Sequence, residues 1–304
     1  MKTKRVSYFE ASARTRVAAL VDEGSFTEFC PPELRMTSPH LARLDAPVGF
    51  DDGVVVGRAS VGGRPVLLAA QEGKFNGGAV GEVHGAKIRG LLERALRDRP
   101  AAVLLLVDSG GVRLHEANAG LIAISEIMRA VLAVQAAGIP VIALVGGSCG
   151  AFGGMGIVTR LCDEVIMSEE GRLGLSGPEV IETVKGVGEF DSRDRSLVWR
   201  VTGGKLRRAL GEATALVDDD ASSFREAVVG CLDRSSAGRD ALDELELLQA
   251  AQQRLQQRRE RFADTRDGLE VWRSTGFPDP QAVPMLTADA FNAQLAALHA
   301  EVQS

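Results

Sequence analysis

Short apolar runs alternate with stretches of helical spacing through the middle of the chain. Residues 54–60 and 65–71 are rich in β-branched side chains and are joined by a Gly-Gly pair, which predicts a β-hairpin. Residues 102–107 and 141–145 are continuously apolar, as is typical of parallel strands buried on both faces. Residues 163–168 predict one more strand.

Between these runs, apolar residues recur every three or four positions and predict helices. The two longest cover residues 82–97 and 116–137. A third helix is expected through Ile157, and a fourth begins at Pro178, because proline suits the first helical position. A hairpin followed by repeated strand–helix units, with right-handed crossovers, predicts an α/β fold with a parallel sheet and flanking helices.

The two ends of the chain differ from this middle part. Residues 7–30 predict a polar helical start, and residues 30–52 hold four prolines, which predicts an extended arm. Near the other end, a leucine-rich seam runs through a highly charged stretch and predicts a helix that packs on the parent domain or on a partner. The seam consists of Leu242, Leu245, Leu248, Leu255 and Phe262. A proline-rich tail is expected before a last helix from Thr287.

We therefore expect three units. They are an N-terminal helix and arm (1–53), an α/β domain (54–236) and a helical C-terminal segment (237–304).

Composition narrows the class of protein. The chain has 304 residues, 45% hydrophobic and 25% charged, which is ordinary for a soluble globular protein. A net charge of −6, with one Tyr and two Trp, argues against a nucleic-acid surface. The polar start and the lack of an 18-residue apolar run argue against secretion or a membrane span, so a cytoplasmic location is expected. The four cysteines form no C-x-x-C pair, so neither a zinc ribbon nor a disulfide scaffold is predicted.

Two glycine-rich turns carry the candidate chemistry. Residues 108–113 and 146–154 each follow an apolar strand and open a helix. Such a turn leaves backbone N–H groups without intrahelical partners, at the positive end of the helix dipole. Two of them on consecutive strands suggest paired donors for oxygens that gain negative charge. The candidate donors are the amides of Gly111, Val112, Gly150 and Ala151. A purely structural role, tight strand-to-helix packing, is the alternative.

These motifs resemble a known family. Residues 75–81, 108–113, 150–151 and 177–182, in this order and spacing, resemble the carboxyltransferase branch of the crotonase superfamily over residues 54–220. Within that branch the chain most resembles the β subunits of biotin-independent malonate decarboxylases. The segments Ser7-Tyr8-Phe9-Glu10, Ala13-Arg14-Thr15-Arg16 and Gly24-Ser25-Phe26 carry the narrower match. The β subunits of bacterial acetyl-CoA carboxyltransferases normally carry a four-cysteine zinc ribbon that this sequence lacks.

The resemblance implies a crotonase-like fold and a defined reaction. The β subunit and a γ subunit decarboxylate malonyl-S-acyl carrier protein to acetyl-S-acyl carrier protein. The carrier subunit presents a phosphopantetheine-type arm derived from dephospho-CoA. No cofactor or metal is expected on this chain. The γ subunit supplies the facing half of the site, and the second oxyanion site can come from it.

The resemblance and the motifs together suggest a substrate channel. The residues expected to line it are Lys74, Phe75, Asn76, Gly77, Gly78, Ser109, Gly110 and Arg113. Lys74 is either a phosphate contact or a solvated lysine beside a structural turn. Arg113 either binds a carboxylate through two hydrogen bonds or forms a structural ion pair.

The remaining polar groups near the turns leave alternatives open. His115 and Glu116 either deliver the proton to the carbanion or act as polar residues at a helix start. Cys149 is read as a small filler rather than a nucleophile, since no histidine lies near it in sequence. Two rival functions remain: a biotin-dependent acyl-CoA carboxyltransferase subunit, and a non-catalytic subunit that docks a carrier protein.

Overall fold

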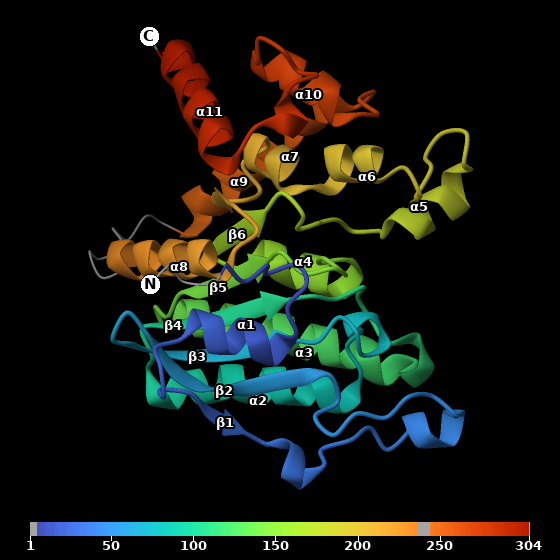
Figure 1. The fold of residues 1–304 in the computed structure, drawn as a ribbon, viewed down its shortest axis with the longest axis vertical. Helices are drawn as coiled ribbons and strands as arrows, with labels where there is room; N and C mark the ends of the chain where they lie inside the picture. The colour runs from blue at the N-terminus through green and yellow to red at the C-terminus, as the bar shows by residue number, and fades with distance from the viewer. Residues whose placement is uncertain (1–4, 236–243, 304) are drawn as a thin grey trace.

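A seven-stranded sheet forms the centre of the computed structural model, which describes residues 5–235 and 244–303 (Figure 1). The strands follow one another in chain order, β1 to β7; β1–β2 and β2–β3 pair antiparallel, and the rest pair parallel. They are β1 (Thr27–Phe29), β2 (Val54–Val61), β3 (Arg64–Gln71), β4 (Ala102–Val107), β5 (Val141–Val145), β6 (Glu164–Ser168) and β7 (Ala215–Val217). The sequence predicted β2 to β6, whereas β1 and β7 are too short to show a pattern.

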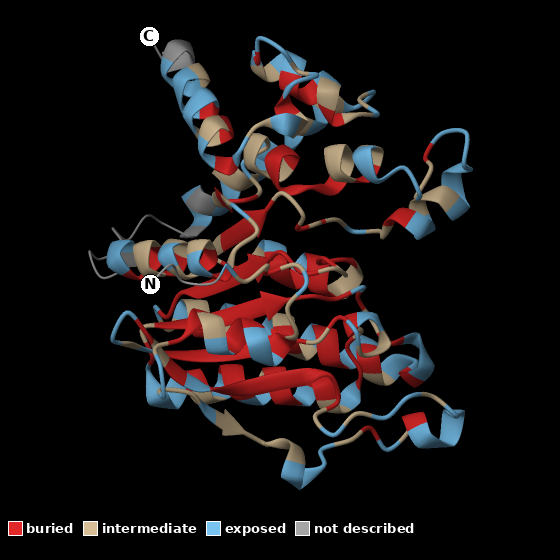
Figure 2. Cartoon of the chain, in the orientation of Figure 1, coloured by how far each residue is buried: buried red, intermediate tan, exposed pale blue. Residues whose placement is uncertain are grey.

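Helices cover both faces of this sheet. α2 (Glu82–Asp98), α3 (Asn118–Ala136) and α4 (Gly153–Leu161) pack on one face, and α1 (Ala13–Leu20) and α8 (Ala221–Ser235) on the other. β4 serves both cores, because Val103 and Leu105 face the first set while Leu104 and Leu106 face the second. Figure 2 shows the resulting buried layer, which confirms the doubly covered sheet expected from continuously apolar strands.

The C-terminal helices gather beyond the β7 edge of the sheet. α5 (Pro178–Lys185), α6 (Arg195–Thr202) and α7 (Gly204–Ala209) precede β7, and α9 (Glu244–Phe262), α10 (Gly268–Thr275) and α11 (Ala288–Gln303) follow α8. A separate core joins α7, α10 and α11 through Trp272, Phe277 and Phe291. Short 3-10 turns are η1 (Pro32–Leu34), η2 (Leu41–Leu44), η3 (Asn76–Gly78), η4 (Leu114–Glu116) and η5 (Val283–Met285).

The described leucines of the α9 seam are largely exposed. Leu245, Leu248 and Leu255 are 58%, 62% and 57% exposed, and Phe262 alone joins the C-terminal core. Leu242 lies outside the described residues. The end of the seam contacts the rest of the chain, since Phe262 joins the C-terminal core and Leu255 lines a pocket with Leu206 and Val271.

Among the helices in the described residues, one is long and apolar enough to cross a membrane by length and composition. This helix is α3, which has a mean hydropathy of 1.5 over an 18-residue window, and 39% of that window is buried inside the protein. Its buried residues, including Ile127, Val131 and Val134, belong to the core shared with α2 and β4. The helix therefore serves as a core helix of the α/β fold.

Candidate active site

The two glycine turns meet at the carboxyl ends of β4 and β5. The Ser109 N–H donates to the Gly150 carbonyl at 2.7 Å, and the Phe152 N–H donates to the Ser109 carbonyl at 3.0 Å. Gly111 has a φ of +121°, and a Cβ there would lie 3.2 Å from the Gly153 Cα. Glycine at position 111 permits both this backbone conformation and this approach, so the two turns stay in contact.

A third loop, predicted as part of the substrate channel, joins them. The Gly110 N–H donates to the Gly77 carbonyl at 2.9 Å, and a Cβ on Gly78 would lie only 1.8 Å from the Asp108 carbonyl oxygen. Asn76 has a left-handed φ of +49°, and its Nδ2 donates to a carbonyl of the N-terminal arm at 3.4 Å. The structure thus brings together the three motifs that the sequence singled out.

Three of the four amides expected as oxyanion donors are engaged inside the chain. The Gly111 N–H donates to Ser109 Oγ at 3.1 Å. The Gly150 and Ala151 N–H groups donate to backbone carbonyls at 3.1 and 2.7 Å. These bonds hold the turns in shape, and they would have to break before a ligand took the same protons.

The Val112 amide is the fourth, and it faces no acceptor within the described part of the chain. A Cβ on Gly153 would lie 4.0 Å from the Val112 nitrogen, so this amide lies beside the start of α4. The Gly153 N–H itself donates to the Leu175 carbonyl at 2.9 Å. The next two amides, those of Gly154 and Met155, have no intrahelical acceptor, and the Gly156 N–H donates to the Phe152 carbonyl at 3.0 Å. The sequence predicted that a helix opens at the glycine run 146–154 but not that it starts at Gly153, because nothing inside the run marks that residue.

The other expected channel residues divide between surface and interior. Lys74 and Gly77 are exposed, and Lys74 Nζ lies 3.5 Å from a backbone carbonyl of the N-terminal segment. The Phe75 ring is turned inward, where a Cβ on Gly49 or Gly53 would meet it at 3.0 or 2.5 Å. Of the expected channel residues, Lys74, Gly77 and Gly110 are therefore the exposed ones.

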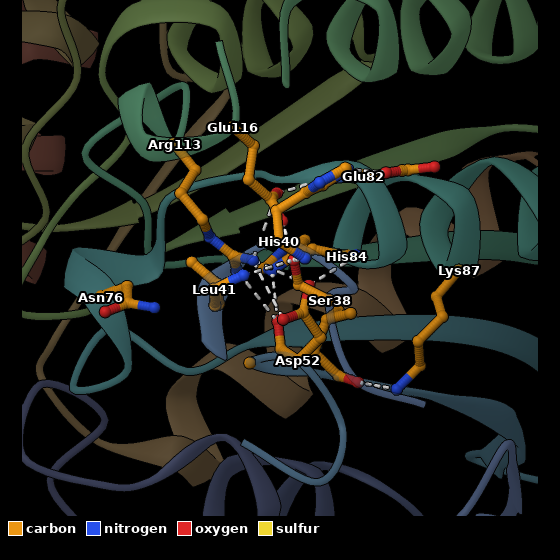
Figure 3. Close-up of polar contacts among 12 residues, drawn as sticks. Ser38, His40, Leu41, Asp52, Asn76, Glu82, His84, Lys87, Arg113 and Glu116 are labelled. Atoms are coloured by element: carbon orange, nitrogen blue, oxygen red, sulfur yellow. Dashed lines mark hydrogen bonds and ion pairs between the residues drawn. The ribbon is translucent and has the colours of Figure 1, made fainter. Parts of the chain in front are cut away.

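Arg113 is directed into the protein rather than toward the open side of the turn. Its side chain is 1% exposed, and Nη1 lies 2.9 Å from both carboxylate oxygens of Asp52 (Figure 3). Nη1 also lies 3.5 Å from Glu116 Oε2, and the ring of Phe75 packs over the guanidinium. This geometry favours the ion-pair alternative and gives Arg113 no direct contact with a substrate.

The two acid–base candidates, Glu116 and His115, differ in their exposure to solvent. Glu116 is buried, and its carboxylate accepts hydrogen bonds from the Glu82 N–H at 2.8 Å and from the Ser38 hydroxyl. His115 is exposed on the rim of the first turn. Of the pair, His115 alone presents its side chain to solvent.

A second buried ion pair holds the other turn, and sequence reasoning did not find it. Arg16 Nη1 donates to Asp108 at 2.8 Å and Arg16 Nε to the Tyr8 carbonyl at 2.8 Å. Asp108 also accepts the Cys149 N–H at 2.7 Å. Burial raises the pKa of the Cys149 thiol above its ordinary value, and the Asp108 carboxylate adds to the rise. A thiol held in this way is a poor nucleophile.

Several large apolar side chains in the segments that follow the turns are exposed. They come from η4, the start of α3 and the segment around α5, and are 54% to 84% exposed. We call this set the apolar rim: Leu114, Leu121, Ile122, Leu175, Val180, Val184 and Val187. A collection of this kind on a soluble protein marks an interaction surface.

No metal site accompanies the turns. Within the described ranges, no three or more His, Cys, Asp and Glu side chains gather closely enough to hold an ion.

A sheet of this order, with paired glycine turns at the carboxyl ends of neighbouring strands, agrees with the predicted carboxyltransferase of crotonase-like fold, and the comparisons with known proteins show it. The model of the carboxyl transferase domain matches residues 10–199, and the chain belongs to this family. It is 38% identical to the malonyl-S-ACP:biotin-protein carboxyltransferase of Malonomonas rubra over 97% of both chains.

Solved structures agree. A chain of the Pseudomonas malonate decarboxylase hetero-tetramer, in complex with malonate, matches with a TM-score of 0.78 and 43% identity. The match covers 88% of this chain and 97% of that one. The acetyl-coenzyme A carboxylase carboxyl transferase β subunit of Fusobacterium nucleatum is 32% identical over 58% of this chain and 59% of its own length. The similarity to the Malonomonas rubra and Pseudomonas proteins thus covers 97% and 88% of this chain, whereas the similarity to the Fusobacterium nucleatum protein covers 58%.

Proposed function

We propose that this chain is the β subunit of a malonate decarboxylase and acts on malonyl-S-acyl carrier protein. The observation that carries the proposal is the unengaged Val112 amide beside the first turn of α4. The Val112 amide and the free amides at the start of α4 are backbone donors of the kind that suits a thioester oxygen that gains negative charge. The near full-length similarity to a chain of Pseudomonas malonate decarboxylase supports the substrate.

The reaction needs what these donors supply. Loss of CO2 breaks the bond between the α-carbon and the carboxylate and leaves the electron pair on carbon, delocalised onto the thioester oxygen. Fixed amides stabilise this enolate without reorganising, and losing one typically costs about 3–4 kcal/mol of barrier. Uptake of a proton at carbon then completes the acetyl thioester. We assign the relay of that proton to His115, which is exposed after the first turn.

The apolar rim supports a site shared with another subunit. We assign this surface to the γ subunit, which supplies the facing half of the site and shields the enolate from water. The carrier subunit presents its phosphopantetheine-type arm past Lys74 and Gly77, and this chain holds no cofactor of its own. A cytoplasmic location fits this reaction.

A second candidate keeps the same first step. The Malonomonas rubra relative is named a malonyl-S-ACP:biotin-protein carboxyltransferase. In that reaction the carboxyl group leaves the malonyl thioester for biotin instead of departing as CO2. The enolate oxygen needs the same donors in both reactions, so the glycine turns do not separate them.

The deciding experiment measures CO2 release from a malonyl thioester by this chain co-expressed with its γ partner, without biotin. Release that requires both chains is expected for the decarboxylase. No release, with carboxyl transfer appearing once a biotin carrier is supplied, would assign the chain to the carboxyltransferase reaction. Absence of both reactions in an assembled complex would overturn the proposal and favour a docking role.

A further inference from the structure

A buried charge cluster adjoins the unengaged amide of the first glycine turn. The cluster consists of Asp52, Arg113 and Glu116, whose side chains are 0–1% exposed. Arg113 follows Val112 directly, and its own N–H donates to the Val80 carbonyl at 2.9 Å. The peptide bond between Val112 and Arg113 is therefore anchored by the backbone and by the Arg113 side chain.

Asp52 is itself fixed by several contacts. It adopts a left-handed φ of +54°, which is unusual for a residue other than glycine. Its carboxylate accepts the His84 N–H at 2.9 Å, and its carbonyl lies 3.0 Å from His84 Nδ1 and 3.2 Å from Arg113 Nη2. The arm therefore presents this carboxylate to Arg113 in one orientation.

Glu116 is fixed from the opposite side. Its carboxylate accepts the N–H of Glu82, at the first position of α2, and the hydroxyl of Ser38 in the arm. A Cβ on Gly81 would lie 1.7 Å from Glu116 Oε2, so the backbone of α2 approaches the carboxylate as closely as glycine permits. The cluster joins the arm, the start of α2 and the segment that follows the first turn (Figure 3).

Stability alone is a weak explanation for this arrangement. Two carboxylates share one guanidinium, and removing three charges from water costs several kcal/mol per ion. Well-packed apolar side chains at such sites are often as stable or more so. What an apolar cluster lacks is a set of directional contacts that fix the orientation of the backbone it adjoins.

We infer that Asp52, Arg113 and Glu116 form a positioning unit that fixes the Val112 amide toward the reacting thioester oxygen. This inference rests on the proposed function, since it concerns the same oxyanion donor. Arg113 acts through the adjacent peptide bond and does not touch the substrate. A displacement of about 1 Å at a catalytic group can cost about 10²-fold in rate, which is the scale of the effect expected here.

The test is Asp52→Asn in the assembled two-chain complex. The change keeps the shape of the side chain but removes one charge of the cluster. With a malonyl thioester, kcat is expected to fall about 10- to 100-fold while KM stays within about threefold, because an interaction made in the transition state weakens. Rates are measured well below the unfolding temperature of each complex.

The matched control is Asp267→Asn. Asp267 pairs with Arg200 at 2.9 Å and caps α10, away from the glycine turns, and asparagine keeps the cap. This variant should lose stability but retain kcat. An Asp52→Asn complex that also retains wild-type kcat, and only melts earlier, would overturn the inference. If Asp52→Asn does not assemble, Glu116→Gln takes its place with the same expected results.

A spectroscopic measurement separates this inference from the proposed function. The infrared carbonyl stretch of bound [1-13C]acetyl-CoA reports hydrogen bonding to the thioester oxygen. It is expected to move in Asp52→Asn toward the value of the free thioester, and an unchanged stretch would contradict the inference. If the wild-type complex transfers carboxyl groups instead of releasing CO2, the proposed function fails, and kcat for transfer tests the positioning unit.

Discussion

Each glycine turn is backed by a buried arginine–aspartate pair, and the two pairs differ. Behind the second turn, Arg16 pairs with one carboxylate, that of Asp108, and its other N–H groups donate to backbone carbonyls. Behind the first turn, Arg113 meets two carboxylates, Asp52 and Glu116. At the second turn, one guanidinium therefore faces one carboxylate. At the first turn, one guanidinium faces two carboxylates.

The difference follows what each turn does with its amides. At the second turn the Gly150 and Ala151 N–H groups bond within the chain, and Asp108 accepts the Cys149 N–H. At the first turn the Val112 N–H has no acceptor in the described part of the chain. We therefore interpret the second turn as a support, and propose that the first turn, together with the start of α4, is the surface that meets a ligand.

Removing the cation behind the second turn should have the largest effect on stability. Arg16→Leu leaves the Asp108 carboxylate buried without its partner, which is expected to lower the free energy of unfolding by about 3–5 kcal/mol. Chemical denaturation of the assembled complex measures it. Arg14→Leu is the control, because the Arg14–Glu28 pair is 45% exposed at the arginine and is worth at most about 1 kcal/mol. Equal losses in the two variants would show that Asp108 does not depend on Arg16.

Deleting the donor of the first turn should affect the rate instead. Val112→Pro removes an N–H that bonds to nothing in the described chain, so turnover is expected to fall about 10²- to 10³-fold. Val112→Ala keeps the N–H and should stay within about threefold of wild type. Steady-state CO2 release and a thermal melt are measured for both. A folded Val112→Pro complex with full activity would remove Val112 from the site.

A buried histidine behind the first turn should make the stability of the protein sensitive to acid. His84, beside Asp52, is fully buried, and burial together with the charge of Arg113 lowers its pKa from 6.5 to about 3. Below pH 6.5 the unfolded chain therefore binds a proton that the folded chain does not, so stability falls as the pH falls toward 3. Denaturation of His84→Gln between about pH 7 and pH 4 should show a shallower fall than wild type.

The control for that measurement is the exposed His115. His115→Gln should reproduce the wild-type slope with pH. If His84→Gln does so as well, the buried imidazole contributes nothing to acid lability.

The smallest effect is expected at Cys149. Cys149→Ala leaves the backbone N–H that Asp108 accepts and removes a thiol whose pKa is raised, so CO2 release should stay within about twofold of wild type. A loss of 10²-fold or more in a folded complex would make Cys149 a nucleophile and the second turn a catalytic element.

The sequence predicted the parts of this molecule that repeat. β2 to β6 and α2 to α4 were predictable because apolar spacing reports local burial. The three-residue strands β1 and β7 carry no period, and the helix start at Gly153 is hidden in a run of glycines. The motifs of the site were visible, but their supports were not.

Those supports come from distant segments. Asp52 lies 61 residues from Arg113 in sequence, and Arg16 lies 92 residues from Asp108. Neither pairing has a local pattern, since a buried aspartate in a proline-rich arm looks like any solvated turn residue. The inward direction of Arg113 follows from the fold and could not be obtained from its place after two glycines.

The apolar rim also bears on how the chain exists in a cell. A subunit that displays Leu114, Val184 and their neighbours to water is prone to self-association and to recognition by chaperones and proteases. Copies of the chain whose apolar rim is not covered by a partner are therefore the ones expected to self-associate or to be degraded. Under the proposed function, the supply of this polypeptide is tied to the supply of its γ partner, and the scarcer of the two sets the amount of functional complex.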